Sequence, residues 1–158
     1  MKLGEIIPEG GILDDLKSEG KEDVIKEMVQ ALVKAGRVEE AASKKVVKAL
    51  MDREELGSTG IGQGVAVPHA KHDSINDLVG AFGRSKKGIN FDALDGEPVH
   101  VFFLLLSSKS ASGAHLEALA YISRLVRDEK FVKFLRDARD VSGLRELLHE
   151  ADQTLGGN

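Results

Sequence analysis

The sequence predicts an α/β domain, a three-layer sandwich in which a mixed β-sheet carries helices on both faces. Helix-spaced apolar stretches alternate with strand-like stretches along the chain. The stretch 99–106 is almost entirely apolar, which is typical of a central strand covered on both sides. The length of 158 residues suits one compact domain. We therefore expect a single domain over residues 1–151, followed by a flexible polar tail over 152–158.

Composition narrows the possible functions. Apolar residues make up 42% and charged residues 30% of the chain, a globular balance, and cysteine is absent, which excludes disulfides and thiolate chemistry. The net charge of −4 disfavours a nucleic-acid partner. No apolar run approaches the ~20 residues of a membrane span. We therefore expect a cytoplasmic protein with no membrane insertion.

Two helices are predicted in the first third of the chain. Short extended pieces around turns are expected at residues 6–13. Apolar residues at helical spacing then predict one helix from Lys21 to about Gly36 and a second from residue 38 or 39 to about Glu54. Arg53 falls in the last turn of the second helix, where a cation complements the helix dipole.

Strands dominate the middle of the chain. Residues 65–67 predict a short buried strand, and residues 70–77 a polar loop. A strand is expected at 78–84, where its glycines indicate a bulge or a close approach. The chain is then expected to turn away at 86–88, before the central strand.

The last third is predicted to be helical. After a loop of small residues, apolar spacing indicates a helix with His115 in its first turn. A short helix is expected around 131–135 and a final one around 144–148, with Asp140 or Ser142 as its N-cap.

His69 is the main candidate for chemistry. Four glycines occur within residues 57–64, followed by the strand at 65–67 and by Pro68. Glycine permits close approach to the main chain, and proline stiffens the corner at which His69 is presented. A neutral imidazole can act as a nucleophile, a base or a metal ligand. The alternative is that this stretch is only a glycine-rich turn and a Pro-His corner.

His115 is the second candidate. A helix N-terminus attracts anions and favours a neutral imidazole, and ligands collect beyond the carboxyl ends of strands in α/β sheets. If the two strands preceding His69 and His115 are neighbours, both histidines and Arg53 could surround one anion. The alternative is that His115 is a partly exposed residue with no partner.

The other histidines fit different interpretations. His100 and His149 are expected to be structural. His72 with His69 and Asp73 leaves a metal site open, although one short pair is a weak signal. The glycine run follows a helix and opens a strand, the reverse of a dinucleotide fingerprint, so nucleotide binding is not expected.

Several motifs together resemble one family, the IIA domain of the phosphoenolpyruvate-dependent sugar phosphotransferase system (PTS), fructose/mannitol type, which includes the nitrogen-regulatory IIA proteins. The resemblance rests on residues 53–69, on 90–96, on His115-Leu116 and on 122–125. It covers nearly the whole chain, which would then be one type-2 IIA domain. It also implies an α/β sandwich around a mixed sheet.

What the resemblance implies is a histidine phosphocarrier. His69 would accept a phosphoryl group from phospho-HPr, with the tele nitrogen, Nε2, as the expected acceptor, and pass it to a IIB partner or hold it as a signal. The positions of His115 and Arg53 match the family's supporting histidine and arginine. No metal or cofactor is implied. Ser107-Ser108 stands where relatives often carry a proline, so the loop leading to His115 is expected to differ while the histidines stay in place.

The glycine stretch would then serve as a phosphate-binding loop. Its expected members are Thr59, Gly60, Gly62 and Gly64, whose N–H groups would hold phosphoryl oxygens together with Arg53.

Three functions compete. The preferred one is a nitrogen-regulatory IIA-like carrier whose phosphorylation state controls binding to other proteins, because the chain reads as a IIA domain without a fused partner. The alternative is the IIA subunit of a fructose/mannitol-type sugar transporter. A third is a metal hydrolase built on His69, His72 and His115.

Overall fold

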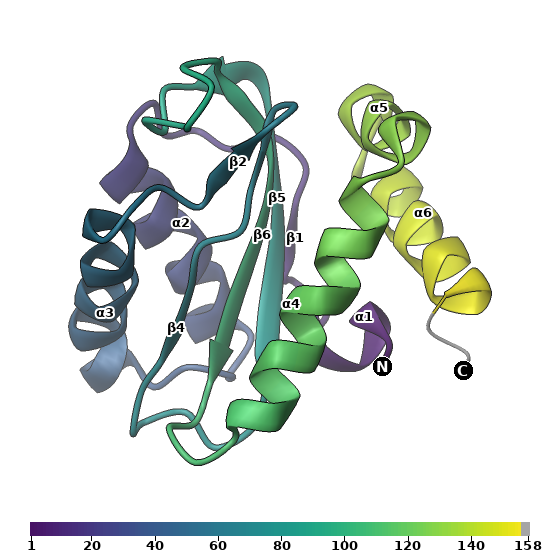
Figure 1. Ribbon diagram of the computed structural model, residues 1–158. Coiled ribbons are helices and arrows are strands. Elements are labelled where there is room, and N and C mark those ends of the chain that lie inside the picture. Colours follow the sequence, from purple (N-terminus) through teal and green to yellow (C-terminus); the bar gives the residue numbers. More distant parts are fainter. Residues whose placement is uncertain (156–158) are drawn as a thin grey trace.

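The computed structural model describes residues 1–155 as three layers around a mixed β-sheet (Figure 1). The helices labelled α2 and α3 cover one face of the sheet, and α4, α5 and α6 lie on the other face with the short α1. This arrangement confirms the predicted sandwich with helices on both faces.

The sheet has six strands in the order β1-β5-β6-β3-β2, with β4 also paired to β6. β5 and β6 are antiparallel, whereas β3 and β4 both run parallel to β6. β6 is thus the central strand, as its apolar sequence predicts. The bounds are β1 (Ile12–Leu13), β2 (Gly60–Gly62), β3 (Val65–Ala66), β4 (His69–Lys71), β5 (Val79–Ile89) and β6 (Val99–Ser107).

The five predicted helices all form, as α2 (Lys21–Lys34), α3 (Ser43–Glu55), α4 (Ser112–Val126), α5 (Glu129–Asp137) and α6 (Val141–Thr154). A short helix that was not predicted, α1 (Leu3–Ile6), precedes them, and a 3₁₀ turn lies at Glu40–Ala42. The Asp140 side chain accepts from the Gly143 N–H at 2.9 Å, so Asp140 rather than Ser142 caps α6.

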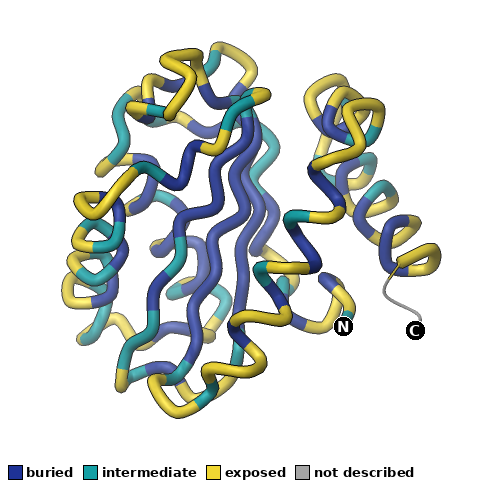
Figure 2. The backbone as a smooth tube through the Cα atoms, in the orientation of Figure 1, coloured by how far each residue is buried: buried dark blue, intermediate teal, exposed yellow. Residues whose placement is uncertain are grey.

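The alternation of side chains along β6 divides the core in two. Phe102, Leu104 and Leu106 pack with α2 and α3, while Val101, Phe103 and Leu105 face α4, α5 and α6. Figure 2 shows the strands as a buried centre, with exposed residues on the outer sides of the helices. By the same alternation, Ser107 at the end of β6 faces the layer that contains α4.

Three local predictions are wrong. Ile6, expected to be extended together with residues 7 and 8, instead ends a short helix over residues 3–6, and the backbone becomes extended only at Ile7. Ala70 and Lys71 belong to β4, because the free edge of β6 supplies backbone partners for a segment that reads as a polar loop. The strand expected to end at residue 84 runs on to Ile89 through an irregular register opposite β6.

The predicted tail also differs from the structure at its first residues. α6 continues to Thr154, and the carboxylate of Asp152 is buried. That carboxylate accepts from the Leu3 N–H (2.7 Å), the Gly4 N–H (2.8 Å) and the Tyr121 hydroxyl (2.6 Å). It therefore caps α1, a contact that spans nearly the whole chain. The last part of the expected tail, residues 156–158, lies outside the described residues.

Candidate functional site

His69 is the first residue of β4, directly beyond the corner at Pro68. The carbonyl of Pro68 accepts from the Leu105 N–H at 2.9 Å, and His69 is paired with Leu105 in β6. Since Ala70 points into the core beneath α2 and α3, the half-buried His69 side chain points to the opposite layer. The corner thus presents the imidazole on the side of the sheet where α4 begins.

A backbone hydrogen bond selects the tautomer of His69. Its Nδ1 lies 2.7 Å from the carbonyl oxygen of Val67, and a carbonyl can only accept, so Nδ1 carries the proton. Nε2 therefore has a free lone pair. Burial lowers the pKa of His69, opposed by the Val67 hydrogen bond, and the charge of Arg53 lowers the pKa further. His69 is thus neutral at pH 7 and nucleophilic at Nε2.

His115 lies in the first turn of α4, as predicted, and contacts His69. The two ring centroids are 5.5 Å apart. His115 is buried, and its Nδ1 lies 2.6 Å from the Ser107 hydroxyl oxygen. Burial lowers the pKa of His115 to about 4, with smaller contributions from His69 and Lys71. The alternative of an exposed His115 without a partner is therefore wrong.

Arg53 approaches the same place from the other helical layer. It lies in the last turn of α3, which packs against β4, and its Nη1 donates to the Gly57 carbonyl at 2.9 Å. Its charge is close enough to lower the pKa of His69. The fold thus brings Arg53, His69 and His115 to one edge of the sheet.

The buried Glu54 holds the end of α3 in place. Its carboxylate pairs with Lys21 Nζ at 3.0 Å and accepts from the backbone N–H and the hydroxyl of Thr59. These contacts satisfy a buried charge and tie α3 to α2 and to the start of β2. Nothing in the local sequence pattern marks Glu54 as buried, so this cluster could not be predicted from the sequence.

Two backbone N–H groups of the expected phosphate-binding loop already have partners within the protein. The N–H of Thr59 is bound to Glu54, and that of Gly60 donates to the Ser58 hydroxyl at 3.0 Å. Gly62 and Gly64 form the turn of the β2–β3 hairpin, and both adopt positive φ. The Gly64 carbonyl accepts from Val101 N, whereas His69 pairs with Leu105, about 13 Å further along β6 at ~3.3 Å per residue. Gly62 and Gly64 thus shape a turn remote from His69.

Two further residues adjoin the histidines. Lys71 Nζ donates to the Ser112 hydroxyl at 2.9 Å at the start of α4, and its charge lowers the pKa of His115. Ser107 binds His115 directly. The sequence carried no signal for Lys71, since residues 70–77 read as a polar loop and only the structure places Lys71 two residues from His69 on β4. It also carried none for Ser107, whose partner depends on where α4 lies.

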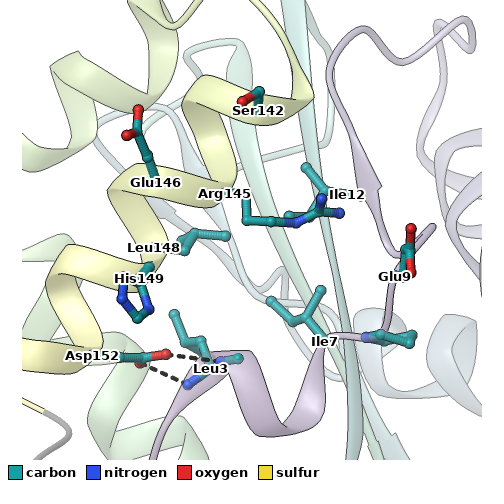
Figure 3. A pocket seen from close by; sticks show the side chains of 12 residues that line it. Leu3, Ile7, Glu9, Ile12, Ser142, Arg145, Glu146, Leu148, His149 and Asp152 are labelled. Atoms are coloured by element: carbon teal, nitrogen blue, oxygen red, sulfur yellow. Dashed lines mark hydrogen bonds between the residues drawn. The ribbon is translucent and has the colours of Figure 1, made fainter.

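The other three histidines have no hydrogen bond to His69 or His115 within residues 1–155. His72 Nδ1 is bound to Ser74, and His100 Nδ1 lies 2.9 Å from the Ser85 carbonyl oxygen. His149 lines a groove of about 720 Å³ between α1 and α6, together with Arg145 (Figure 3). Within residues 1–155, no group of three His, Asp or Glu side chains is placed to hold a metal ion. No helix in the same range is long and apolar enough to cross a membrane.

The sequence and the fold are both similar to proteins of one family. The family described as "Phosphoenolpyruvate-dependent sugar phosphotransferase system, EIIA 2" matches residues 5–151. The fructose-specific PTS EIIABC component of Bacillus subtilis is 38% identical over 153 residues, 97% of this chain. The match spans only 24% of that longer relative.

Two further relatives match over nearly their whole length. A nitrogen regulatory protein of Bradyrhizobium diazoefficiens is 36% identical over 148 residues, covering 94% of this chain and 95% of the relative. The crystal structure of the nitrogen regulatory protein IIA-Ntr from Neisseria meningitidis superposes with a TM-score of 0.82 at 34% identity, covering 92% and 97%. The chain therefore belongs to the EIIA type-2 family of the phosphoenolpyruvate-dependent sugar phosphotransferase system.

Proposed function

We propose that this protein is a phosphoryl carrier that accepts a phosphoryl group from phospho-HPr on Nε2 of His69. The observation that carries the proposal is the 2.7 Å hydrogen bond between His69 Nδ1 and the Val67 carbonyl. It leaves Nε2 as the nucleophilic nitrogen, in a ring whose lowered pKa keeps it neutral at pH 7. Membership of the EIIA family supports the same role.

The proposed step balances without a cofactor. The lone pair of His69 Nε2 attacks phosphorus while the bond between phosphorus and the donor's imidazole nitrogen breaks. The electron pair of that bond leaves with the donor imidazole, and nothing is oxidised or reduced. The proton on His69 Nδ1 stays in its hydrogen bond to Val67 throughout. The protein's contribution is therefore positioning and charge stabilisation rather than acid–base chemistry.

We propose that three side chains stabilise the transferred group. His115 lies against His69, and the charge of Arg53 reaches the His69 ring. A planar guanidinium matches phosphate geometry, so we assign Arg53 to the phosphoryl oxygens. Lys71 supplies a second cation beside the start of α4. These groups take the role first assigned to the glycine loop.

We further propose that the phosphorylation state serves as a regulatory signal. The support is the similarity to a nitrogen regulatory protein, which aligns with the present chain over 95% of its own length. The alternative, the IIA subunit of a fructose/mannitol-type transporter, is favoured by the 38% identity to a fructose-specific EIIABC component. Adding purified IIB to the phosphorylated protein separates the two, because rapid transfer to IIB supports the transport role and retention supports the regulatory one.

The acceptor is tested by intact mass after incubation with phosphoenolpyruvate, enzyme I and HPr. We expect one acid-labile phosphoryl adduct on the wild type, none on His69→Ala, and a normal adduct on the control His72→Ala. An adduct that survives in His69→Ala would overturn the assignment. So would an unmodified wild type in a mixture whose HPr is phosphorylated.

A further inference from the structure

The two neighbouring histidines have chemically different partners at Nδ1. His69 Nδ1 faces the Val67 carbonyl at 2.7 Å, which can only accept a hydrogen bond. His115 Nδ1 faces the Ser107 hydroxyl at 2.6 Å, which can donate or accept. The tautomer of His69 therefore follows from its partner alone, whereas that of His115 depends on where the hydroxyl proton goes.

The burial of Ser107 decides the direction of that hydrogen bond. Ser107 is fully buried at the end of β6, and its hydroxyl has His115 Nδ1 as its only hydrogen-bond partner among residues 1–155. If the hydroxyl donates, its proton is satisfied. If it accepted a proton from Nδ1 instead, its own proton would be left buried without an acceptor, at about 1–3 kcal/mol. The favourable arrangement therefore has Ser107 donating and Nδ1 unprotonated.

We propose that Ser107 is a positioning residue that holds neutral His115 in the Nε2–H tautomer, the opposite of the Nδ1–H tautomer of His69. This inference rests on the proposed phosphocarrier function for its purpose. The pair then offers one bare Nε2, on His69, as the nucleophile. It also offers one Nε2–H, on His115, as a hydrogen-bond donor to a phosphoryl oxygen.

A hydroxyl suits this position better than the other possible partners. A carbonyl would hold His115 in the Nδ1–H form and remove the donor from Nε2. A carboxylate would stabilise the imidazolium and raise the pKa of the ring. An alanine or valine would leave Nδ1 without its partner. Ser107 is thus suited to support the neutral His115.

The test reads the tautomers directly from two-bond ¹H–¹⁵N correlation spectra of the full chain at pH 7.5, without phosphorylation. We expect His69 in the Nδ1–H form and His115 in the Nε2–H form. Ser107→Ala should shift His115 toward a mixture of tautomers, and Ser107→Thr, which keeps the hydroxyl, should restore the wild-type pattern. The matched control is Ser108→Ala, whose half-exposed hydroxyl contacts Ser110 instead.

The wild-type spectrum alone can overturn the proposal, since a His115 found as Nδ1–H contradicts it whether or not any variant folds. An unchanged His115 tautomer in Ser107→Ala would contradict it as well. In the transfer assay we expect Ser107→Ala to slow phosphorylation about tenfold, the effect of one lost hydrogen bond of roughly 1.4 kcal/mol. If the wild type accepts no phosphoryl group, the proposed function fails, and the tautomer spectra still decide the role of Ser107.

Discussion

The imidazole of His69 lies against that of His115, with ring centroids 5.5 Å apart and ring planes inclined by 56°. The contact follows from sheet topology. β4 runs parallel to β6, and α4 begins just beyond the end of β6, so the two rings meet at one edge of the sheet. Burial keeps both rings neutral at pH 7, which leaves their reactivity to be set by their hydrogen-bond partners.

The first prediction concerns His115 as a supporting group. His115→Ala should slow phosphoryl transfer from phospho-HPr by about 10- to 100-fold without abolishing it, because one donor to the phosphoryl group is lost while the nucleophile remains. Single-turnover transfer rates measure the effect. His149→Ala, at an exposed position on α6, is the control and should transfer at the wild-type rate. An unchanged rate in His115→Ala would remove this residue from the site.

The second prediction concerns the charge of Arg53. Arg53→Gln should reduce the transfer rate about 10- to 100-fold, because it removes the cation that we assign to the phosphoryl oxygens. It should also raise the pKa of His69 slightly, since the charge of Arg53 lowers it.

The control for this prediction lies on the same helix. Lys48 is exposed and paired with Asp52, so Lys48→Gln removes one positive charge away from the histidines. Transfer kinetics and a histidine titration by NMR are measured for both variants. Equal effects of the two substitutions would mean that only net charge matters.

The third prediction is a pH dependence of stability. The pKa of His115 is lowered from about 6.5 to about 4, so the unfolded chain binds a proton at this position before the folded chain does. This stabilisation is complete above about pH 6.5 and is lost as the pH falls toward 4. Lowering the pH from 7 to 5 therefore lowers the free energy of unfolding by about 2 kcal/mol, at ~1.4 kcal/mol per pH unit.

Urea denaturation at pH 7 and pH 5 tests this prediction. His115→Gln lacks the titrating group, so its stability should fall less on acidification than that of the wild type by about the same 2 kcal/mol. All other titrating groups, His69 included, are shared by the two proteins. Parallel losses in both would show that His115 does not titrate below its ordinary range.

The fourth prediction concerns the buried carboxylate of Asp152. Asp152→Ala should lower the free energy of unfolding by about 2–4 kcal/mol, because the Leu3 and Gly4 N–H groups and the Tyr121 hydroxyl lose their acceptor. The adjacent Gln153 is exposed, and Gln153→Ala should change stability by less than about 0.5 kcal/mol. Chemical denaturation of both variants measures the difference. A small loss in Asp152→Ala would indicate that α6 does not anchor the N-terminus.

The sequence by itself determined the architecture and the acceptor candidate. Its apolar periodicities predicted α2 to α6 and the central strand β6, because burial imposes a spacing of about 3.6 residues on helices and of two on strands. The Pro68 corner after a short buried strand singled out His69. Such features are local, so they can be recognised without knowing which segments are neighbours.

Only the tertiary structure decided which groups surround His69. The parallel pairing of β4 with β6 brings His115 and Lys71 beside each other, and the packing of α3 brings Arg53. The pairing of β3 with β6 places Gly64 near the start of β6, away from His69.

The hydrogen-bond partners of buried polar groups likewise could not be predicted from the sequence. Glu54 is satisfied by Lys21 and Thr59, Asp152 by the N-terminus, and His115 by Ser107. A buried polar group must find a partner wherever the fold supplies one, and that partner can lie anywhere along the chain. Local periodicity and the Pro68 corner therefore specified the elements and the candidate acceptor His69, while long-range packing set the tautomers, charges and contacts around it.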